Sequence, residues 1–487
     1  MNERAPGGKG QEGGATAFLG RGPIEDRRRA GRDGRARTPR KALGDMPLSD
    51  RDPLPILAAS NAGRVASLIP IRHGRMLESP FAFYRGAAAL MAHDLAQLPH
   101  SGVFVQLCGD AHLANFGLFA SPERRVLFGI NDFDETLPGP FDWDLRRLAA
   151  SFAIAALHRG HGAPRQRQAV ATLCAAFREA IRDAVGGDTL DQWYRELTAD
   201  EVLGLARTRR ERAMDEATVE KARRSTSRAF LRKATEIVDG QLRIREEPPT
   251  TYHYPAAGVE EAAGFHGTVC QFFADYRESL PDERRVLFDR YRLVDIAVRV
   301  VGVGSVGTRC YVALFMADGE SPLFLQVKEA RASVLEAYLA PSDYGNHGQR
   351  VVCGQRLLQS ASDIFLGWSR SVASGFDFYV RQLRDMKGSF DIDGFSFEEL
   401  DTYARACGIA LACSMSKAGD PAAIAGYVGK SNALDDAMQR FALAYAERNE
   451  ADYAAFAAAV RDGQVEAADE SDSISHRRGT ETRRGPR

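Results

Sequence analysis

Residues 103–134 have the sequence VFVQLCGDAHLANFGLFASPERRVLFGINDFD, and this stretch carries the clearest signal about the fold. Residues 103–108, 116–120 and 125–130 are rich in β-branched and aromatic side chains, which predicts three strands. A turn is expected at 121–124, so that the second and third strands form a hairpin. This hairpin brings the polar loop after the first strand and the acidic loop after the third strand to the same end of the strands.

The two loops contain side chains suited to phosphoryl transfer. Asp110 can accept the proton of an attacking hydroxyl, and Asn115 and Asp132 can hold Mg²⁺ through oxygen ligands. Asp134 is a candidate second carboxylate for the metal, and His112 either supports the loop by hydrogen bonding or takes part in catalysis. Asp-x-x-x-x-Asn followed by Asp-Phe is the spacing of a kinase catalytic loop and metal loop. Asp and Asn are also common in turns and caps, so the prediction rests on the whole set.

A second stretch, VGVGSVG at residues 301–307, has the pattern Gly-x-Gly-x-x-Gly after a predicted strand. Dinucleotide-binding folds share this pattern, but they need a helix after the glycines, and residues 308–315 are strand-like. A third strand at 323–328 ends in Lys328. These three antiparallel strands describe a kinase nucleotide lobe, in which the glycine loop approaches the phosphates of ATP and Lys328 pairs with them. The residues predicted to hold the nucleotide are Gly302, Gly304, Ser305, Gly307 and Lys328. The alternative is a plain glycine-rich hairpin with a surface lysine.

The order of the two stretches is the reverse of that in protein kinases, where the glycine loop and the lysine come first. After Lys328, the sequence continues like the middle of a kinase, and Glu336 on the next helix is the candidate acidic partner of that lysine. Two strands are expected at 363–368 and 378–383, followed by a hinge-like turn and a helix. The prediction is an α+β, protein-kinase-like two-lobe fold that is circularly permuted, with the catalytic-loop segment before the glycine-loop β lobe. Permutation is tolerated where the original termini lie close together on the surface.

Composition and periodicity divide the chain into six segments. They are a disordered basic tail (1–50), a helical-lobe segment with the catalytic and metal loops (51–240), a connection and helix (241–290), a β-rich nucleotide-binding lobe (291–383), the continuation of the helical lobe (384–465) and a second disordered tail (466–487). Helices are expected at 81–98, 143–157 and 166–185, and along a charged run at 201–238. Asp142 or Asp144 is expected to cap the helix that starts near residue 143.

Composition also argues against several classes of protein. The 487 residues include 64 Lys and Arg against 65 Asp and Glu, so the net charge of −1 gives no general attraction to nucleic acid. No apolar stretch approaches the roughly 20 residues that a membrane span needs, and the N-terminus lacks a signal core. The 7 cysteines never form a Cys-x-x-Cys pair, which fits a reducing compartment. We therefore expect a cytoplasmic protein without membrane or nucleic-acid partners, whose oligomeric state stays open.

Several motifs resemble a known family. They are RM at 75–76, SPFAFYRG at 79–86, CGDAHL at 108–113, NDFDET at 131–136 and YVRQL at 379–383. They resemble the uncharacterised bacterial family known as domain of unknown function 2252 (DUF2252), over roughly residues 50–462.

A more distant resemblance links residues 108–115 and 130–134 to the His-Gly-Asp-x-His-x-x-Asn and Ile-Asp-Phe/Trp motifs of aminoglycoside phosphotransferase-type kinases. It implies that Asp110 is the base, that Asn115 and Asp132 are metal ligands and that Asp144 is structural. Cys108 stands where those kinases have the leading His, and Met415 lies near a position where relatives carry a His, which implies altered substrate handling.

The expected function is that of an ATP- and Mg²⁺-dependent phosphotransferase acting on a hydroxyl of a small molecule or a protein. Adenylyl transfer at the same site is an alternative. A second alternative is a metal-dependent hydrolase in which Asp110, His112, Asp132 and Asp134 bind the ions. The third is a catalytically inactive nucleotide-binding regulator that uses the run at 201–238 as a partner surface.

Overall fold

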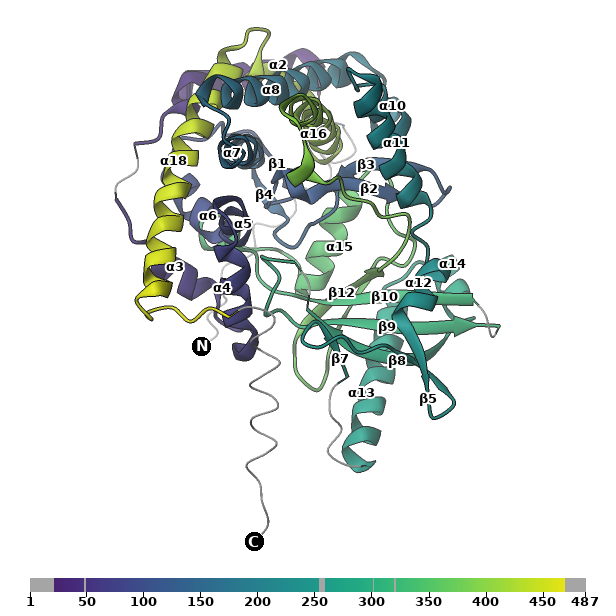
Figure 1. The fold of residues 1–487 in the computed structure, drawn as a ribbon. Coiled ribbons are helices and arrows are strands. Elements are labelled where there is room, and N and C mark those ends of the chain that lie inside the picture. Colours follow the sequence, from purple (N-terminus) through teal and green to yellow (C-terminus); the bar gives the residue numbers. More distant parts are fainter. Residues whose placement is uncertain (1–21, 48–49, 254–258, 301, 319–320, 469–487) are drawn as a thin grey trace, which may run out of the picture.

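The computed structural model describes residues 22–47, 50–253, 259–300, 302–318 and 321–468, and these form a mixed α+β protein. Figure 1 shows a helix-rich part, which contains both the N-terminal and the C-terminal helices, beside a part built on one antiparallel sheet.

The sheet has six strands in the order β11-β12-β10-β9-β8-β7. Their bounds are β7 Thr251–Tyr252, β8 Arg292–Arg299, β9 Cys310–Ala317, β10 Ser321–Ala330, β11 Gly367–Arg370 and β12 Asp377–Gln382. The connection between β8 and β9 contains the glycine loop, and the register pairs Lys328 of β10 with Cys310 and Tyr379 of its two neighbours. The strands predicted on both sides of the glycine loop, and the strand ending in Lys328, are confirmed. The strand expected at 363–368 is displaced, because residues 363–366 form a turn and β11 begins at Gly367. Residues 319 and 320, between β9 and β10, lie outside the described residues.

Each face of the sheet has its own apolar cluster. Phe273 and Tyr276 of α13 (Val259–Glu278) pack with Phe315 on one face, and Phe230 of α12 (Ser227–Ala234) packs with Phe324 on the other. The predicted helix near 265–279 is thus part of α13, which covers the sheet.

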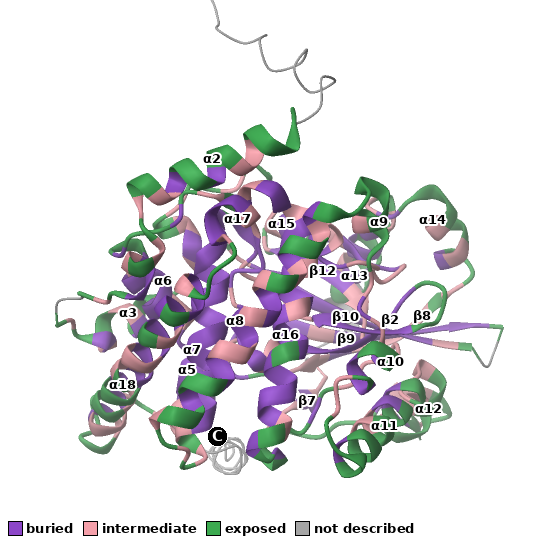
Figure 2. Ribbon diagram, turned by 90° about the horizontal axis from the view of Figure 1, so that it is seen from above, coloured by how far each residue is buried: buried purple, intermediate pink, exposed green. Residues whose placement is uncertain are grey.

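The helix-rich part surrounds two short antiparallel pairs, β1 with β4 and β2 with β3. These strands are β1 Phe104–Leu107, β2 Phe116–Ala120, β3 Val126–Ile130 and β4 Leu137–Pro140, so the strands and hairpin predicted from the opening stretch are confirmed. Its helices are α3 Pro53–Ser60, α4 Ile69–Leu77, α5 Pro80–Gly86, α6 Ala88–Ala96, α7 Phe141–His158, α8 Ala163–Gly186, α9 Thr189–Tyr194, α10 Ala199–Leu203, α11 Arg209–Arg223, α16 Phe397–Ala418, α17 Pro421–Val428 and α18 Ala433–Arg461. Figure 2 shows that α7, α8 and α16 lie at the centre with buried faces, whereas α2 (Ile24–Arg37), α11 and α12 present exposed faces.

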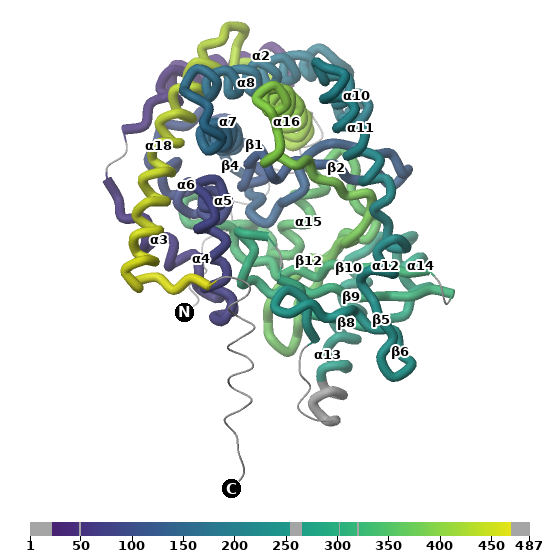
Figure 3. The backbone as a smooth tube through the Cα atoms, in the orientation of Figure 1, coloured from purple at the N-terminus to yellow at the C-terminus, as the bar shows by residue number. Residues whose placement is uncertain are grey.

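Two segments join the halves. The turn at 384–388 leads from β12 back to the helices, and Gly388 exchanges two hydrogen bonds with Leu118 of β2. Helix α15 (His347–Leu358) packs against β11 and β12 on one side and contacts β1 and α16 on the other. Figure 3 shows the N-terminal helices α3 to α6 beside the C-terminal helix α18. Segments from the two ends of the sequence therefore pack together in the helix-rich part.

The predicted disordered tail over residues 1–50 is wrong for much of its second half. Residues Ile24–Arg37 form α2, which packs on α17 and is held by an ion pair of 2.7 Å between Arg27 and Asp420. Gly31 allows this approach, because a Cβ atom there would collide with the carbonyl oxygen of Ala423. The arginine-rich composition of this segment did not indicate a helix, because α2 contacts α17 through small residues and has no stripe of large apolar side chains. Residues 1–21, and 469–487 of the predicted C-terminal tail, lie outside the described residues.

Three helix predictions need correction. The expected helix at 81–98 is two helices, because the backbone leaves the helical region at Ala87 between α5 and α6. The charged run at 201–238 divides into α10, α11, α12 and β5 (Thr235–Val238), since Thr208 and Thr226 each cap a new helix. Neither Asp142 nor Asp144 caps α7, because both carboxylates accept hydrogen bonds from neighbouring loops.

No helix in the described residues is long and apolar enough to cross a membrane.

Candidate active site

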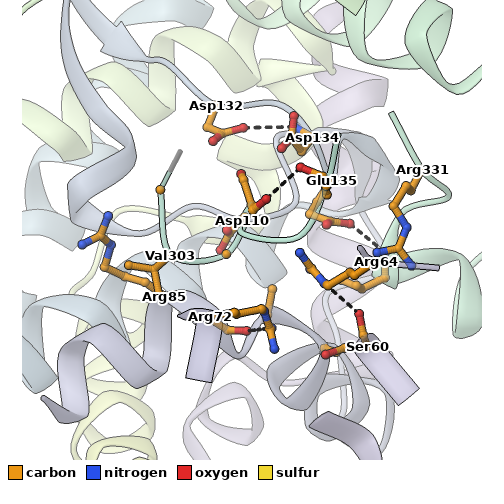
Figure 4. Close-up of a pocket in the computed structure, with 18 of the residues that line it drawn as sticks. Ser60, Arg64, Arg72, Arg85, Asp110, Asp132, Asp134, Glu135, Val303 and Arg331 are labelled. Atoms are coloured by element: carbon orange, nitrogen blue, oxygen red, sulfur yellow. Dashed lines mark hydrogen bonds between the residues drawn. The ribbon is translucent and has the colours of Figure 1, made fainter. Parts of the chain in front are cut away.

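One pocket of about 260 Å³ brings together the two loops of the opening stretch and the glycine loop (Figure 4). Asp110, Asn115, Asp132 and Asp134 line it together with His112. From the second stretch, Gly302, Gly304 and Ser305 line the same pocket. The β2–β3 hairpin is the local cause of the first grouping, because it returns the chain so that the Asn131 amide donates to the Asn115 carbonyl over 2.8 Å. Sequence reasoning had expected these groups to converge, although they come from segments nearly 200 residues apart.

Asp144 of α7 holds the loop that carries Asp110. The Asp144 carboxylate accepts hydrogen bonds from the backbone amides of Cys108 (2.8 Å) and Gly109 (3.0 Å). Burial raises the pKa of Asp144 to about 6, and the two amides act against that rise. Gly109 has φ +85°, and a Cβ atom there would collide with the backbone of Glu135, so the tight turn before Asp110 requires glycine. Asp144 therefore positions the loop.

Asp110 itself is held by a buried arginine. Arg147 of α7 donates from Nε to its Oδ1 over 2.5 Å, and the same guanidinium lies over the ring of Tyr84 at 4.5 Å. Asn115 donates from its side-chain amide to the Asp110 carbonyl over 3.0 Å, which leaves the Asn115 amide oxygen as an acceptor. The carboxylate of Asp110 is thus fixed in orientation while it faces the pocket.

His112 is buried and lies 3.8 Å from the Asp110 carboxylate, measured from its Nε2. Burial, with smaller contributions from the charges of Arg147 and Arg85, lowers its pKa from 6.5 to about 3, although the negative charge of Asp110 acts in the opposite direction. The imidazole is therefore neutral in the folded protein at neutral pH. The position of His112 next to Asp110 is compatible with both roles considered from the sequence, which are support of the loop and participation in catalysis.

The neutral state of His112 leads to a prediction about acid stability. The unfolded chain binds a proton on this residue below about pH 6.5, whereas the folded chain does so only near pH 3, so stability is lost as the pH falls through that window. For this residue alone, the free energy of unfolding should fall by about 2 kcal/mol between roughly pH 8 and pH 5. Urea melts of wild type and of His112→Gln at both pH values measure this, and the variant should lose less stability on acidification. An identical loss in both proteins would contradict the assignment.

Lys328 lies at the junction of the sheet and the acidic loop. Its ammonium donates to the carboxylate of Asp134 and lies 4.0 Å from that of Asp132. Tyr379 of β12 donates to the other oxygen of Asp134 over 2.8 Å. Burial alone would lower the pKa of Lys328, but the two carboxylates outweigh it and raise the pKa well above its usual value.

The two carboxylates respond differently to this lysine. Burial and the charge of Asp134 raise the pKa of Asp132. Burial also acts to raise that of Asp134, but the contacts with Lys328 and Tyr379 lower it overall. Asp134 is therefore the principal ion partner of Lys328, and Asp132 remains the carboxylate more open to the pocket.

The expected pairing of Lys328 with Glu336 is wrong. Within the described chain, the ion pairs of Lys328 are those with Asp132 and Asp134. Glu336 instead completes a capping box with Ser333 in a short 3₁₀ helix and lies 3.8 Å from Arg350. The helix expected directly after β10 begins only at His347, so Glu336 precedes it and its side chain serves the local turn.

The glycine loop is anchored to the N-terminal helices. Val65 donates from its amide to the Gly307 carbonyl over 2.8 Å, and Arg64 donates to the Val306 carbonyl over 2.6 Å. Gly307 has φ +90°, and a Cβ atom there would lie 3.1 Å from the side chain of Arg64, so glycine is needed at this contact. Sequence reasoning missed this role of residues 60–86, which form one wall of the pocket.

Four arginines that line the pocket were also missed as site residues: Arg64, Arg72 and Arg85 of that wall, and Arg331 after β10. Only Arg85 lies in one of the quoted motifs, SPFAFYRG, and the others carry no pattern that distinguishes them among the many arginines of the chain. In the described residues, no group of three or more His, Cys, Asp or Glu side chains lies in an arrangement that could hold a metal ion.

Comparison with known proteins gives one match. The model of the family described as "Uncharacterized protein conserved in bacteria (DUF2252)" matches residues 64–459, which is well over half of the chain. Neither the curated proteins nor the solved structures contain a match.

Proposed function

We propose that this chain, which belongs to the DUF2252 family, is an ATP- and Mg²⁺-dependent phosphotransferase with a circularly permuted, kinase-like fold. The observation that carries the proposal is the meeting of Asp110, Asn115 and Asp132 with the glycine loop in one pocket. A base, oxygen ligands for a metal and a backbone loop for phosphates are the parts that phosphoryl transfer requires.

The sheet supports the same proposal. The strands β8, β9 and β10 are consecutive and antiparallel, with the glycine loop in the first connection and Lys328 on the third strand. A glycine loop over the phosphates and a lysine on the third strand are the elements of a kinase nucleotide lobe. In this chain Asp134 takes the role of orienting the lysine, which the αC glutamate performs in protein kinases. Asp134 is thus assigned a positioning role, beyond the metal-ligand role considered from the sequence.

In the proposed reaction, a hydroxyl oxygen of the acceptor attacks the γ-phosphorus of ATP. The hydroxyl proton passes to Asp110, and the bond between the γ-phosphorus and the β–γ bridging oxygen breaks, so that ADP leaves. Arg147 keeps the Asp110 carboxylate aimed at the pocket, and Asp144 keeps its loop in place. The acceptor is a small molecule or a protein.

The donor set fits Mg²⁺. Mg²⁺ at nucleotide sites is bound by one or two carboxylates, with phosphate oxygens and water completing its shell. Asp132 and the amide oxygen of Asn115 would hold the ion, with Asp134 as a further carboxylate. When bound, Mg²⁺ offsets the negative charge of the phosphate oxygens.

The metal-dependent hydrolase is less well supported. It needs a protein-built metal centre, and among the described residues no set of three acidic, His or Cys side chains is arranged to form one. One of its candidate ligands, Asp110, is also held by Arg147.

Thermal melting with nucleotide tests the proposal. ATP with Mg²⁺ should raise the melting temperature of the full chain more than ATP with EDTA does, because Asp132 and Asn115 would hold the ion and the ion would offset the negative charge of the phosphates. A ligand at 100 times its Kd adds about 2.7 kcal/mol to the free energy of unfolding. Mg²⁺ alone is the control. The absence of any shift at millimolar nucleotide would contradict the proposal, and an equal shift with and without Mg²⁺ would contradict the metal requirement.

A further inference from the structure

Part of the pocket wall is built from arginines. Arg64 precedes α4, Arg72 lies in α4, Arg85 in α5, and Arg331 follows β10. Figure 4 shows Asp132 and Asp134 at the top of the view and Asp110 near its centre, with Arg85 beside Val303 on the left, Arg72 below, and Arg64 and Arg331 on the right. Four cations thus share one pocket with the proposed base.

These arginines have no carboxylate partners. Among the described residues, none of the four forms an ion pair with a carboxylate, and the hydrogen bonds of Arg64, Arg72 and Arg331 go to neutral groups. Arg72 donates to the Gly86 carbonyl (2.6 Å) and to the Asn61 side chain (2.9 Å). Its side chain is 1% exposed, and its Nε has no partner within the described chain, as is also true of the buried Nε of Arg85.

The acidic residues of the pocket do not neutralise this wall directly. Asp110 is paired with Arg147, Asp134 with Lys328, and Glu329 with Arg309 at 3.0 Å. Glu135 accepts a hydrogen bond of 2.7 Å from the Val334 amide. Asp110, Asp134 and Glu329 therefore have cationic partners other than these four arginines.

The uncompensated charge is costly to the folded protein. Burial, together with the charges of neighbouring arginines, lowers the pKa of Arg72 to about 9 and that of Arg64 to about 10. For Arg64, the negative charges of Glu135, Asp134 and Glu329 act in the opposite direction but do not outweigh burial. A buried cation without a counter-ion is unfavourable, and several together repel one another. Such a cluster is stable in the presence of a multivalent anion that enters the pocket.

We propose that Arg64, Arg72, Arg85 and Arg331 form a binding site for a phosphate group. Guanidinium groups match phosphate oxygens with paired hydrogen bonds, and several of them together favour a dianion over a single carboxylate. This inference rests on the proposed function where it concerns the acceptor: a phosphate held here would place the rest of a phosphorylated acceptor near Asp110. The same chemistry could come from the terminal phosphate of the nucleotide.

Inorganic phosphate is the probe that tests the site without nucleotide. Calorimetric titration of the full-length protein at constant ionic strength should detect binding of phosphate. Arg85→Gln should weaken that binding roughly tenfold, the factor expected when a charge-assisted hydrogen bond is lost. Arg182→Gln, on the exposed side of α8, is the matched control and should bind phosphate like the wild type. If Arg85→Gln does not fold, Arg331→Gln replaces it, since its hydrogen bond goes only to the Ala62 carbonyl.

A second titration identifies the source of the phosphate group. If phosphate still binds in the presence of Mg²⁺ and a non-hydrolysable ATP analogue, the site belongs to the acceptor. If the analogue excludes phosphate, the site holds the terminal phosphate of the nucleotide, and the phosphate site is upheld in both cases.

The proposal is overturned if the wild type does not bind phosphate, or if Arg85→Gln and Arg331→Gln, both folded, bind it as well as the wild type. If the protein binds phosphate but does not bind ATP, the proposed function is disproved, whereas the proposed phosphate site is upheld. Turnover of ATP by a protein that does not bind phosphate would do the reverse.

Discussion

Replacing Asp110 with asparagine is expected to abolish phosphoryl transfer while the protein still binds ATP and Mg²⁺. Asparagine keeps the size of the side chain and an oxygen that can accept the hydrogen bond from Arg147, but it cannot take up the proton of the acceptor hydroxyl. Loss of a general base reduces turnover by about 10²–10⁴-fold. A screen of metabolites and proteins with labelled ATP, run on wild type and variant in parallel, measures the effect.

The matched control is Asp183→Asn, on the exposed face of α8, which changes the same chemical group away from the pocket. It should transfer phosphate like the wild type. Thermal melts should show the same ATP- and Mg²⁺-dependent rise for Asp110→Asn as for the wild type. If Asp110→Asn turned over ATP at the wild-type rate, Asp110 would not be the general base.

Replacing Lys328 with methionine should have the second large effect, on both stability and nucleotide use. The lysine is 2% exposed and is the ion partner of Asp134. Removing one member of a buried ion pair costs about 3–5 kcal/mol, because the other charge remains buried without a partner. The variant should therefore melt at a lower temperature and lose the stabilisation by ATP with Mg²⁺.

The double variant Lys328→Met with Asp134→Asn separates the two effects. It removes both charges, and the amide can still accept the hydrogen bond from Tyr379. It should regain part of the lost stability but none of the turnover. Unfolding measured by urea and turnover measured with labelled ATP give the two readouts. Turnover by either variant at the wild-type rate would show that Lys328 is dispensable, as the hydrolase alternative requires.

The predicted strands, turn and loops of residues 103–134 are confirmed, and so are the strands on both sides of the glycine loop. These features depend on alternation and turn chemistry within short windows, where neighbouring residues decide the conformation. Helix boundaries were less accurate, because Ala87 and the capping threonines in the charged run interrupt continuous helical periodicity. The helix at Ile24–Arg37 was missed because its contacts use glycines instead of an apolar stripe.

Within the candidate site, the sequence indicated Asp110, Asn115 and Asp132 by their spacing, and they line one pocket. It indicated the wrong partner for Lys328, because spacing along the chain favoured Glu336, whereas Asp134 lies 194 residues away in sequence. The sequence did not indicate the cluster of Arg64, Arg72, Arg85 and Arg331. These arginines lie on separate segments and come together only when those segments pack against one another.

The sequence alone determined which segments form strands and tight loops and which acidic and amide side chains those loops present, because these properties depend on residues a few positions apart. The tertiary structure decided which charges face one another: the lysine of the sheet with the acidic loop, and the arginines of the N-terminal helices with the cavity. Burial sets the strength of those charge interactions, and burial depends on how the sheet packs against the helices.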